Sequence, residues 1–478
     1  MTRPCRIPTA SGLIYRLSLS VAVTLAAVSL AVSIRDAYRR SGVDVNIKVA
    51  AAKTISRGWD PYWNVVAISS DGTVLTPEHA DRTYPRLTVP PTVLLVYVPL
   101  AELPYKVQRR LWFAAEWASL AGSIVILLRR TRHVQARRLL LVTALLFFVS
   151  SYFWRLHAER GQYYVFLLLL LCSGAARFLS SGDRGWSAAI LFGIAAALRP
   201  SLALIALPLF VLGARRTAIM TCAVAAALVL ATLPITGFQA WVSYVQSVSI
   251  MERHVFDYYF TAEPIGMPIY TGFPGGYADM AEIAGKGDNT SLLGAFLPHV
   301  RAALGWPSQT LSNAVVRMGA VCFVSACGMA WWRSRRRGRV SRRVLMAVSL
   351  AFCSALDIFV PIRLHYVDVL YLAPLGLFAE PVFRLGRPLF PAALVALGLV
   401  VGSGGTSFVS EPHTVQLRTA GIVAGLTCLA VWFCLARAPR ATRHPRQKPA
   451  DCNQSGSQEQ DAGTSTVRST AEPSTGPV

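Results

Sequence analysis

The sequence predicts an all-α polytopic membrane protein with about twelve transmembrane helices, within a range of eleven to thirteen. Three observations predict this fold class. Hydrophobic residues make up 54% of the 478 residues, whereas charged residues make up only 15%. The apolar residues recur in runs suited to membrane helices, and arginines gather in the short segments between those runs. Because a soluble chain of this length would divide into domains, the repeated runs favour one helical membrane body.

The apolar runs give twelve candidate spans in chain order. They lie near Leu13–Ile34, Leu111–Leu128, Leu139–Phe153, Gly161–Ala176, Trp186–Leu198, Leu202–Leu212, Ala218–Ile235, Val315–Trp331, Val344–Val360, Val367–Phe378, Pro388–Val401 and Ala420–Leu435. The first run follows Arg3, Arg6 and Arg16, and no convincing small-residue cleavage site follows it. We therefore expect a membrane anchor there rather than a removed signal peptide.

A thirteenth apolar stretch, Thr88–Pro104, contains four prolines and decides the predicted sidedness. If this stretch crosses the membrane, the five arginines between Arg129 and Arg138 fall outside, against the positive-inside rule. If it is re-entrant or lies in the outer leaflet, every strong arginine cluster falls inside. We therefore predict a multi-pass protein of the plasma (inner) membrane with both termini in the cytoplasm.

The same map divides the chain into two parts. A transmembrane domain covers residues 1–440 and includes two extracytoplasmic loops, 35–88 and 236–309, in which we expect interfacial helices. Residues 441–478 are polar and lack apolar periodicity, so we expect a disordered cytoplasmic tail. The net charge of +23 could suit a nucleic-acid partner. Since the arginines lie between spans, we assign the charge to membrane topology and predict no nucleic acid.

The first loop carries a carboxylate and a turn sequence close to the membrane. Asp44 precedes Gly58-Trp59-Asp60-Pro61-Tyr62. The segment between them can form an amphipathic helix on the bilayer surface, with Lys48, Lys53 and Arg57 toward the headgroups. That geometry would hold Asp44 where a lipid phosphate meets water. The pattern fits an enzyme at the membrane surface better than a transporter or a receptor.

Polar side chains from several segments share the exterior side under this topology. They are Asp44 and Asp60, Glu159-Arg160-Gly161-Gln162, Arg199, Asn289-Thr290-Ser291, and Arg363 with His365. The chemistry they suggest is transfer of a sugar from a lipid phosphate donor. An acceptor hydroxyl has a very high pKa, so a carboxylate must accept its proton, and Asp44 is the candidate base. The departing lipid phosphate needs a cation, for which Arg199 is the candidate, and His365 could ligate the phosphate or hold the base.

Each of these residues also has a structural interpretation. Asp44 could cap the interfacial helix, Asp60 could form a turn before Pro61, and Arg199 could pair within the protein. No Asp-x-Asp pair occurs in the chain, which weighs against a nucleotide-sugar donor held through a divalent metal. We therefore predict no metal site and no cofactor.

Several short motifs occur along the chain in an order and spacing that resemble those of a known family. They are Asp44 with Gly58-x-x-Pro61-Tyr62, Tyr84-Pro85 leading to Pro99-Leu100, Gly161-Gln162, Gly193-Ile-Ala-Ala-Ala-Leu-Arg199-Pro200, Asn289-Thr290-Ser291 and His365. From about Asp44 to Phe378 the chain resembles the polyprenol-phosphate-mannose-dependent mannosyltransferases of the GT-C superfamily, glycosyltransferase family 87. The resemblance implies a GT-C fold with an extracytoplasmic active site, a β-linked polyprenyl phosphate sugar as donor, inversion to an α-linkage, and no required metal.

The resemblance also carries roles onto residues of this chain. It places the catalytic base on Asp44 and a functional histidine on His365. We assign substrate binding to Arg199, Gln162, Asn289, Asp60 and Tyr62. The chain departs from the family pattern at Lys48, where an aromatic side chain is usual, and at Tyr164, where asparagine is common.

These observations together predict an integral membrane glycosyltransferase. We expect it to transfer a sugar, with mannose as the first choice, from a polyprenyl phosphate donor to a cell-envelope glycolipid or lipoglycan acceptor within membrane lipid. Arabinofuranosyl transfer from a decaprenyl phosphate donor by a protein of the same fold stays open. A secondary transporter is the rival class, but it would need charged residues along midplane helices. A non-catalytic membrane scaffold would not need Asp44.

Overall fold

The computed structural model describes residues 10–39, 42–62, 64–65, 78–79, 87, 89–260, 308–337, 341–357, 365–385, 395–396 and 412–435. Its first elements are α1 (Ala10–Arg39), α2 (Val43–Ser56), β1 (Asn64–Val65), β2 (Glu78–His79), α3 (Pro91–Tyr97), η1 (Val98–Leu100), α4 (Tyr105–Arg130), α5 (Val134–Ala144), η2 (Leu145–Val149), α6 (Tyr152–Arg160) and α7 (Tyr164–Ser181). The later elements are η3 (Gly182–Arg184), α8 (Trp186–Leu198), η4 (Pro200–Ile205), α9 (Ala206–Val211), α10 (Arg215–Phe260), α13 (Ser308–Arg337), α14 (Arg342–Leu356), η6 (His365–Tyr371), α15 (Leu372–Leu385) and α17 (Pro412–Leu435). Apart from the antiparallel pair β1–β2, the regular structure of the described residues is helical.

Several of these helices are suited to a membrane. Within the described ranges, four are long and apolar enough to cross it: Gly12–Ala37, Tyr105–Arg130, Tyr164–Arg184 and Arg215–Val248. A fifth crossing results if Val134–Val149 and Phe153–Arg160, which meet at 56°, count as one broken span. The prediction of an all-α polytopic membrane protein is confirmed, and the number of about twelve spans stays a prediction. The span near Pro388–Val401, apart from 395–396, and the tail 441–478 lie outside the described residues.

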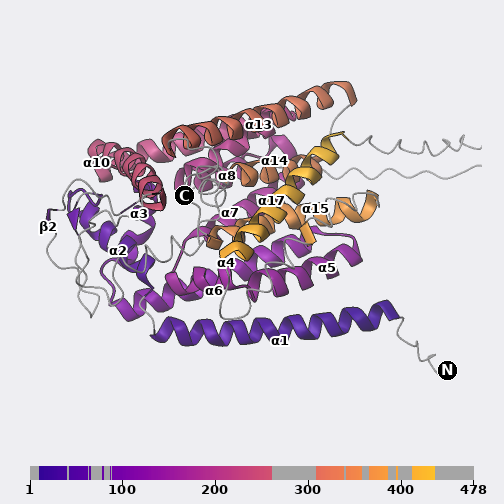
Figure 1. Cartoon of the computed structure of the whole chain (residues 1–478), viewed down its shortest axis with the longest axis horizontal. Helices are drawn as coiled ribbons and strands as arrows, with labels where there is room; N and C mark the ends of the chain where they lie inside the picture. The colour runs from indigo at the N-terminus through magenta and orange to yellow at the C-terminus, as the bar shows by residue number, and fades with distance from the viewer. Residues whose placement is uncertain are drawn as a thin grey trace, which may run out of the picture. The chain divides into compact units, whose positions relative to one another are not determined.

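The helices pack around a buried core of aliphatic and aromatic side chains. α7 packs against both α4 and α8, and α8 packs against α10. α7 and α8 approach closely where Gly174 faces Phe192, because a Cβ at residue 174 would come within 2.6 Å of the ring. Small residues at such contacts let membrane helices pack tightly. Figure 1 shows α1 along one side of the helical body, where it contacts α6, and shows α2 and α3 near one end.

The proline-rich stretch at 88–104 forms a short helical segment. α3 and η1 together cover residues 91–100, which corresponds to roughly 15 Å of helix, about half of the hydrocarbon thickness of a bilayer. The hydroxyl of Thr92 donates to the carbonyl of Ala197 at 2.6 Å, so this segment is fastened to the end of α8. The segment is too short to cross, and this supports the re-entrant or outer-leaflet arrangement.

α10 extends beyond the predicted end of its span at residue 235. Pro234 lacks a backbone N–H, and Gly237 has a φ of 73°, so the helix kinks there and continues to residue 260. The first part of the predicted loop 236–309 is therefore helical. Ser243, beyond the kink, donates to the carboxylate of Asp60 and ties α10 to the turn after α2.

The helices run between two chemically different ends. At one end of α4, Arg109 donates to carbonyls at the end of α6. At its other end, the carbonyl of Arg130 accepts from Arg343 at the start of α14. Glu380 of α15 also pairs with Arg343 at 2.6 Å and accepts from the backbone of Arg132 at 2.9 Å. Arg130, Arg132 and Arg343 therefore gather at the end of the bundle opposite to α2, whereas Arg109 lies at the α2 end.

Candidate active site

Asp44 lies in the first turn of α2 and faces the turn between α6 and α7. Its Oδ2 accepts hydrogen bonds from Nε of Arg160 at 2.6 Å and from Nε2 of Gln162 at 2.5 Å. The side chains of Asp44 and Arg160 are each 17% exposed, so the carboxylate remains within reach of solvent. The N-cap of α2 is Gly42, without a side-chain cap. The alternative that Asp44 caps this helix is therefore wrong.

The α6–α7 turn brings both donors to one carboxylate. α6 ends at Arg160, and Gly161 takes the left-handed conformation with φ 73° and ψ 56°. The backbone N–H groups of Gly161 and Gln162 both donate to the carbonyl of His157, at 2.9 and 3.1 Å. Glycine is the residue that commonly ends helices in this way. Arg160 thus ends one helix and Gln162 precedes the next, and both side chains point to α2.

Gly161 is also the point where α2 approaches α6. The side chain of Val45 packs directly on Gly161, and a Cβ at residue 161 would overlap Cγ2 of Val45. Glycine is required here by the positive φ and by the close approach together. Because Val45 adjoins Asp44, this contact sets how near the carboxylate comes to the turn.

Lys48 faces inward, contrary to the prediction that it points to lipid headgroups. Its side chain is 5% exposed. Nζ donates to Oε1 of Gln162 at 3.1 Å and lies 5.4 Å from the ring centre of Tyr163. The prediction was wrong because residues 44 and 48 share one helix face, and α2 packs that face on the α6–α7 turn. The other basic residues named for this helix, Lys53 and Arg57, are more exposed.

The surrounding charges keep Asp44 ionised. Burial raises the pKa of its carboxyl, but the charges of Arg160 and Lys48 and the two hydrogen bonds outweigh burial, so the pKa lies below its usual value of 3.8. Burial lowers the pKa of Lys48 below its usual value of 10.5, and the Asp44 carboxylate opposes that shift. Asp44 is therefore a carboxylate at neutral pH, which is the form that accepts a proton.

A buried group that was not foreseen from the sequence supports the turn. Nε2 of His157 accepts from the backbone N–H of Val165 at 3.2 Å, so its Nδ1 carries the hydrogen that faces Glu116, 3.2 Å away. Arg109 lies 3.8 Å from Glu116 and donates to the last carbonyls of α6. His157 and Glu116 are fully buried. The signal in the sequence was Glu116 within an apolar run, since a charge inside a membrane helix must find a partner.

Arg199 approaches the same region through two tyrosines. Tyr163 and Tyr164 stack with ring centres 4.7 Å apart, and the guanidinium of Arg199 lies 4.8 Å from the ring centre of Tyr164. Arg199 ends α8 and forms an ion pair with Asp357, which follows α14. The helix break at Arg199 therefore faces protein. Arg199 and Lys48 flank the tyrosine pair, each over one ring.

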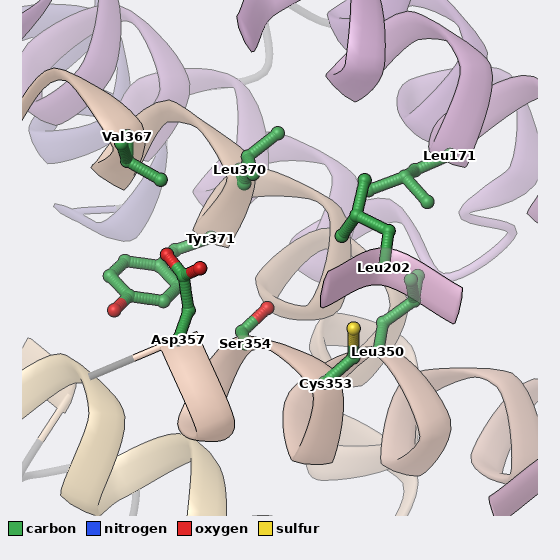
Figure 2. A pocket seen from close by; sticks show the side chains of 9 residues that line it. All are labelled: Leu171, Leu202, Leu350, Cys353, Ser354, Asp357, Val367, Leu370 and Tyr371. Atoms are coloured by element: carbon green, nitrogen blue, oxygen red, sulfur yellow. The ribbon is translucent and has the colours of Figure 1, made fainter. Parts of the chain in front are cut away.

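Asp357, the partner of Arg199, lines a small, mainly apolar cavity. Figure 2 shows Asp357 and Tyr371 among the side chains that line it. The apolar lining includes Leu171, Leu202, Leu350, Val367 and Leu370. Such a lining solvates a carboxylate poorly, so the guanidinium of Arg199 is the charge that stabilises Asp357.

Asp60 and Tyr62 organise the turn after α2. Oδ1 of Asp60 accepts from the backbone N–H of Tyr62 at 2.9 Å, and Oδ2 accepts from the hydroxyl of Ser243. The hydroxyl of Tyr62 donates to the carbonyl of Val89 at 2.8 Å, and burial raises the pKa of this phenol. These contacts fit the turn-forming interpretation of Asp60. Substrate binding by Asp60 or Tyr62 stays a prediction.

Two predicted site residues are not placed by their side chains. Asn289 lies outside the described residues, and His365 is described by its backbone as the first residue of η6. η6 packs against α6 and α7, so the backbone of His365 belongs to an element near the α6–α7 turn. Within the described part of the chain, no three His, Cys, Asp or Glu side chains gather as a metal site. The expectation that no metal is required stays a prediction.

Comparison with known proteins identifies a family and a relative. The sequence model of Glycosyltransferase family 87 matches residues 88–360, a range that includes the α6–α7 turn and Arg199 and begins after Asp44. The chain is 29% identical over 274 residues to the polyprenol-phosphate-mannose-dependent alpha-(1-2)-phosphatidylinositol pentamannoside mannosyltransferase of Mycolicibacterium smegmatis. This alignment covers 55% of the chain and 61% of that relative, which is less than two thirds of its length. No solved structure matches the chain.

Proposed function

The chain belongs to glycosyltransferase family 87, and on that premise we propose that it transfers mannose from a polyprenyl phosphate donor to a cell-envelope glycolipid or lipoglycan. The observation that carries the proposal is Asp44, an ionised carboxylate held by Arg160 and Gln162 at one end of a membrane helix bundle. The similar mycolicibacterial protein is named for a polyprenol-phosphate-mannose donor and a phosphatidylinositol mannoside acceptor. That name supports the donor and acceptor classes.

The proposed reaction inverts the configuration at the sugar carbon C1. The oxygen of the acceptor hydroxyl forms the new bond to C1, and its proton passes to the Asp44 carboxylate. The bond between C1 and the phosphate oxygen breaks, and its electron pair leaves with the polyprenyl phosphate. A carboxylate and a phosphate diester thus become a carboxylic acid and a doubly charged phosphate monoester, so the total charge is unchanged. A β-linked donor gives an α-linked product.

Arg199 stabilises the charge that builds on the departing phosphate in this proposal. The guanidinium is oriented by the ion pair with Asp357 and by the ring of Tyr164, so it need not reorganise as the bond breaks. His365 acts beside it, either on the phosphate or by holding the base. Gln162 positions Asp44 by its hydrogen bond and, with Asn289, Asp60 and Tyr62, contacts the sugar or the acceptor.

The active site faces the extracytoplasmic side in this proposal. The distance along α4 from Arg109, near the site, to Arg130, at the arginine-rich end, is roughly 30 Å. This length equals the hydrocarbon thickness of a bilayer. Arginine-rich segments remain in the cytoplasm, so the opposite end, with Asp44, lies outside. Both termini are then cytoplasmic.

Asp44→Asn tests the proposed base most directly. The variant keeps the size of the side chain but does not accept the proton, so the rate of mannose transfer should fall by about 100-fold or more. The measurement is the initial rate of the purified full chain with polyprenyl phosphate mannose and a membrane glycolipid acceptor. Wild-type rates in the Asp44→Asn variant would exclude Asp44 as the base.

Glu102→Gln is the matched control for this experiment. Glu102 is a carboxylate near the same end of the bundle, is 80% exposed, and lies 3.8 Å from Lys53. Its loss should leave the transfer rate unchanged.

The same assay with decaprenyl phosphate arabinofuranose separates the two donor sugars, because transfer of arabinose without transfer of mannose would contradict the proposed donor.

A further inference from the structure

Lys48 is a buried cation of the site that forms no ion pair with a carboxylate of the described residues. The other cations of the site form ion pairs within the protein: Arg160 with Asp44, Arg109 with Glu116, and Arg199 with Asp357. Lys48 is 5% exposed and donates a hydrogen bond to Gln162. An ammonium has three N–H donors, and Asp44 and Glu116 act on Lys48 only through the longer-range attraction of their charges, so burial of this cation remains costly. This position therefore suits an anionic ligand.

The position of Lys48 relative to Asp44 suits the departing group of an inverting transfer. The two residues are four apart on α2 and share a face. The amide of Gln162 lies between them, since it accepts from Lys48 at 3.1 Å and donates to Asp44 at 2.5 Å. In an inverting reaction the base and the departing group lie on opposite faces of the sugar. A cation for the departing group must therefore lie near the base but must not be bound to it. Lys48 meets this condition, whereas Arg160 is bound to Asp44.

We propose that Lys48 binds the phosphate group of the isoprenoid phosphate, as a diester in the donor and as a monoester in the product. The inference rests on the proposed function and names a binding residue that the sequence had placed at the membrane surface. Lys48 lies over the ring of Tyr163 and Arg199 over that of Tyr164. Of these two flanking cations, Arg199 shares its charge with Asp357, so it acts on the departing phosphate together with Lys48 and not alone. Lys48 supplies the charge that the phosphate neutralises.

The test compares the binding of a phosphorylated and an uncharged isoprenoid to the purified full chain. Lys48→Met removes the charge and keeps an unbranched side chain of similar length. It should raise the Kd for decaprenyl phosphate about tenfold or more, the effect of losing one strong charged contact, and should leave the Kd for decaprenol unchanged. Lys48→Gln removes the charge but can still donate a hydrogen bond to Gln162, so it serves as the second variant if Lys48→Met does not fold. It should show the same loss of affinity for decaprenyl phosphate. Thermal unfolding of each purified variant reports on that fold.

Lys53→Met is the matched control on the same helix. Lys53 is 22% exposed and lies 3.8 Å from the exposed Glu102, so its loss should leave both dissociation constants unchanged. Wild-type binding of decaprenyl phosphate by the folded Lys48 variants would overturn the inference. Equal weakening for decaprenol would also overturn it, because the lost contact would then not involve the phosphate. Weakening for phosphatidylinositol but not for decaprenyl phosphate would assign the charge to a phospholipid and contradict the inference.

Asp44→Asn separates this inference from the proposed function. The variant retains Lys48, so it should bind decaprenyl phosphate at least as tightly as the wild type while failing to transfer mannose. If Asp44→Asn transfers mannose normally, the assignment of Asp44 as the base is wrong, but Lys48 can still bind the phosphate. If the Lys48 variants bind decaprenyl phosphate normally and Asp44→Asn is inactive, Lys48 does not bind the phosphate, and the assignment of Asp44 as the base is retained.

Discussion

At the scale of single residues, Asp44 has two donors of different character. Arg160 brings a full positive charge to Oδ2, whereas Gln162 brings a neutral amide. Against the effect of burial, the charge of Arg160 is the leading influence that lowers the pKa of Asp44. Arg160 therefore sets how readily the carboxylate accepts a proton, and Gln162 sets mainly how it is oriented.

Arg160→Met should move the acid limb of the pH profile to higher pH. The ionised form of Asp44 is the active one, so activity falls as the pH drops through its pKa. In the wild type this fall occurs below the usual value of 3.8, because the pKa is lowered. Without Arg160 the pKa of Asp44 should rise, because burial would then be opposed by less positive charge and by one hydrogen bond fewer. The measurement is kcat/KM against pH, which reports the free enzyme.

Arg155→Met is the matched control for that profile. Arg155 lies on the same helix, α6, but pairs with Asp36 at 3.2 Å instead of with Asp44. The acid limb of the kcat/KM profile of Arg155→Met should coincide with that of the wild type. An unchanged limb in Arg160→Met would show that Arg160 does not govern the proton affinity of the base.

At the scale of elements, the site depends on how closely α2 approaches the end of α6. The contact is made by Val45 on Gly161, whose φ of 73° lies in the left-handed region. Arg109 completes the arrangement, because its side chain packs on Gly42 at the start of α2 and donates to carbonyls at the end of α6. A shift of one helix relative to the other would separate Asp44 from its donors.

Gly161→Ala should abolish transfer. A left-handed alanine costs about 1–2 kcal/mol, and its Cβ would also push Val45 and α2 away from the turn. Gly58→Ala isolates the first effect, because Gly58 has a φ of 78° and a Cβ there would meet nothing within 4 Å. Initial rates and thermal unfolding of both variants separate the contributions. Equal activity in the two variants would contradict the role of the helix contact.

At the scale of the whole molecule, the described helices hold the candidate site at one end and the arginine clusters at the other. α14 begins beside Arg130 and ends beside Asp357, which pairs with Arg199 near the site. α4 runs in the opposite direction between the same two ends. The orientation of the protein in the membrane is therefore known once one of these two ends is shown to face the cytoplasm.

Cysteine labelling should place the two ends on opposite sides of the membrane. In a background without native cysteines, Glu102→Cys should react with an impermeant maleimide applied to intact spheroplasts, because that position lies at the site end and is exposed. Arg339→Cys should react only in inside-out vesicles, since arginine-rich segments stay in the cytoplasm. The reverse pattern would place Asp44 in the cytoplasm and exclude an extracytoplasmic active site.

Much of the membrane architecture follows from the sequence alone. The apolar runs predicted α1, α4, α7 and α8 close to their observed bounds, because a helix in a membrane must satisfy its own backbone and be apolar outside. Local patterns were less informative where helices bend. Pro234 was visible in the sequence, yet the continuation of α10 beyond Gly237 depends on contacts such as that of Ser243 with Asp60.

The sequence by itself determined that this protein is a polytopic helical membrane protein, and it nominated Asp44, Gln162 and Arg199, because charge and polarity are costly in lipid wherever they occur. Only the tertiary structure decided which partners these residues meet. It directed Lys48 away from the headgroups and placed Arg160 on Asp44. The physical reason is that pairing across 116 positions of sequence depends on helix packing, which no local pattern encodes.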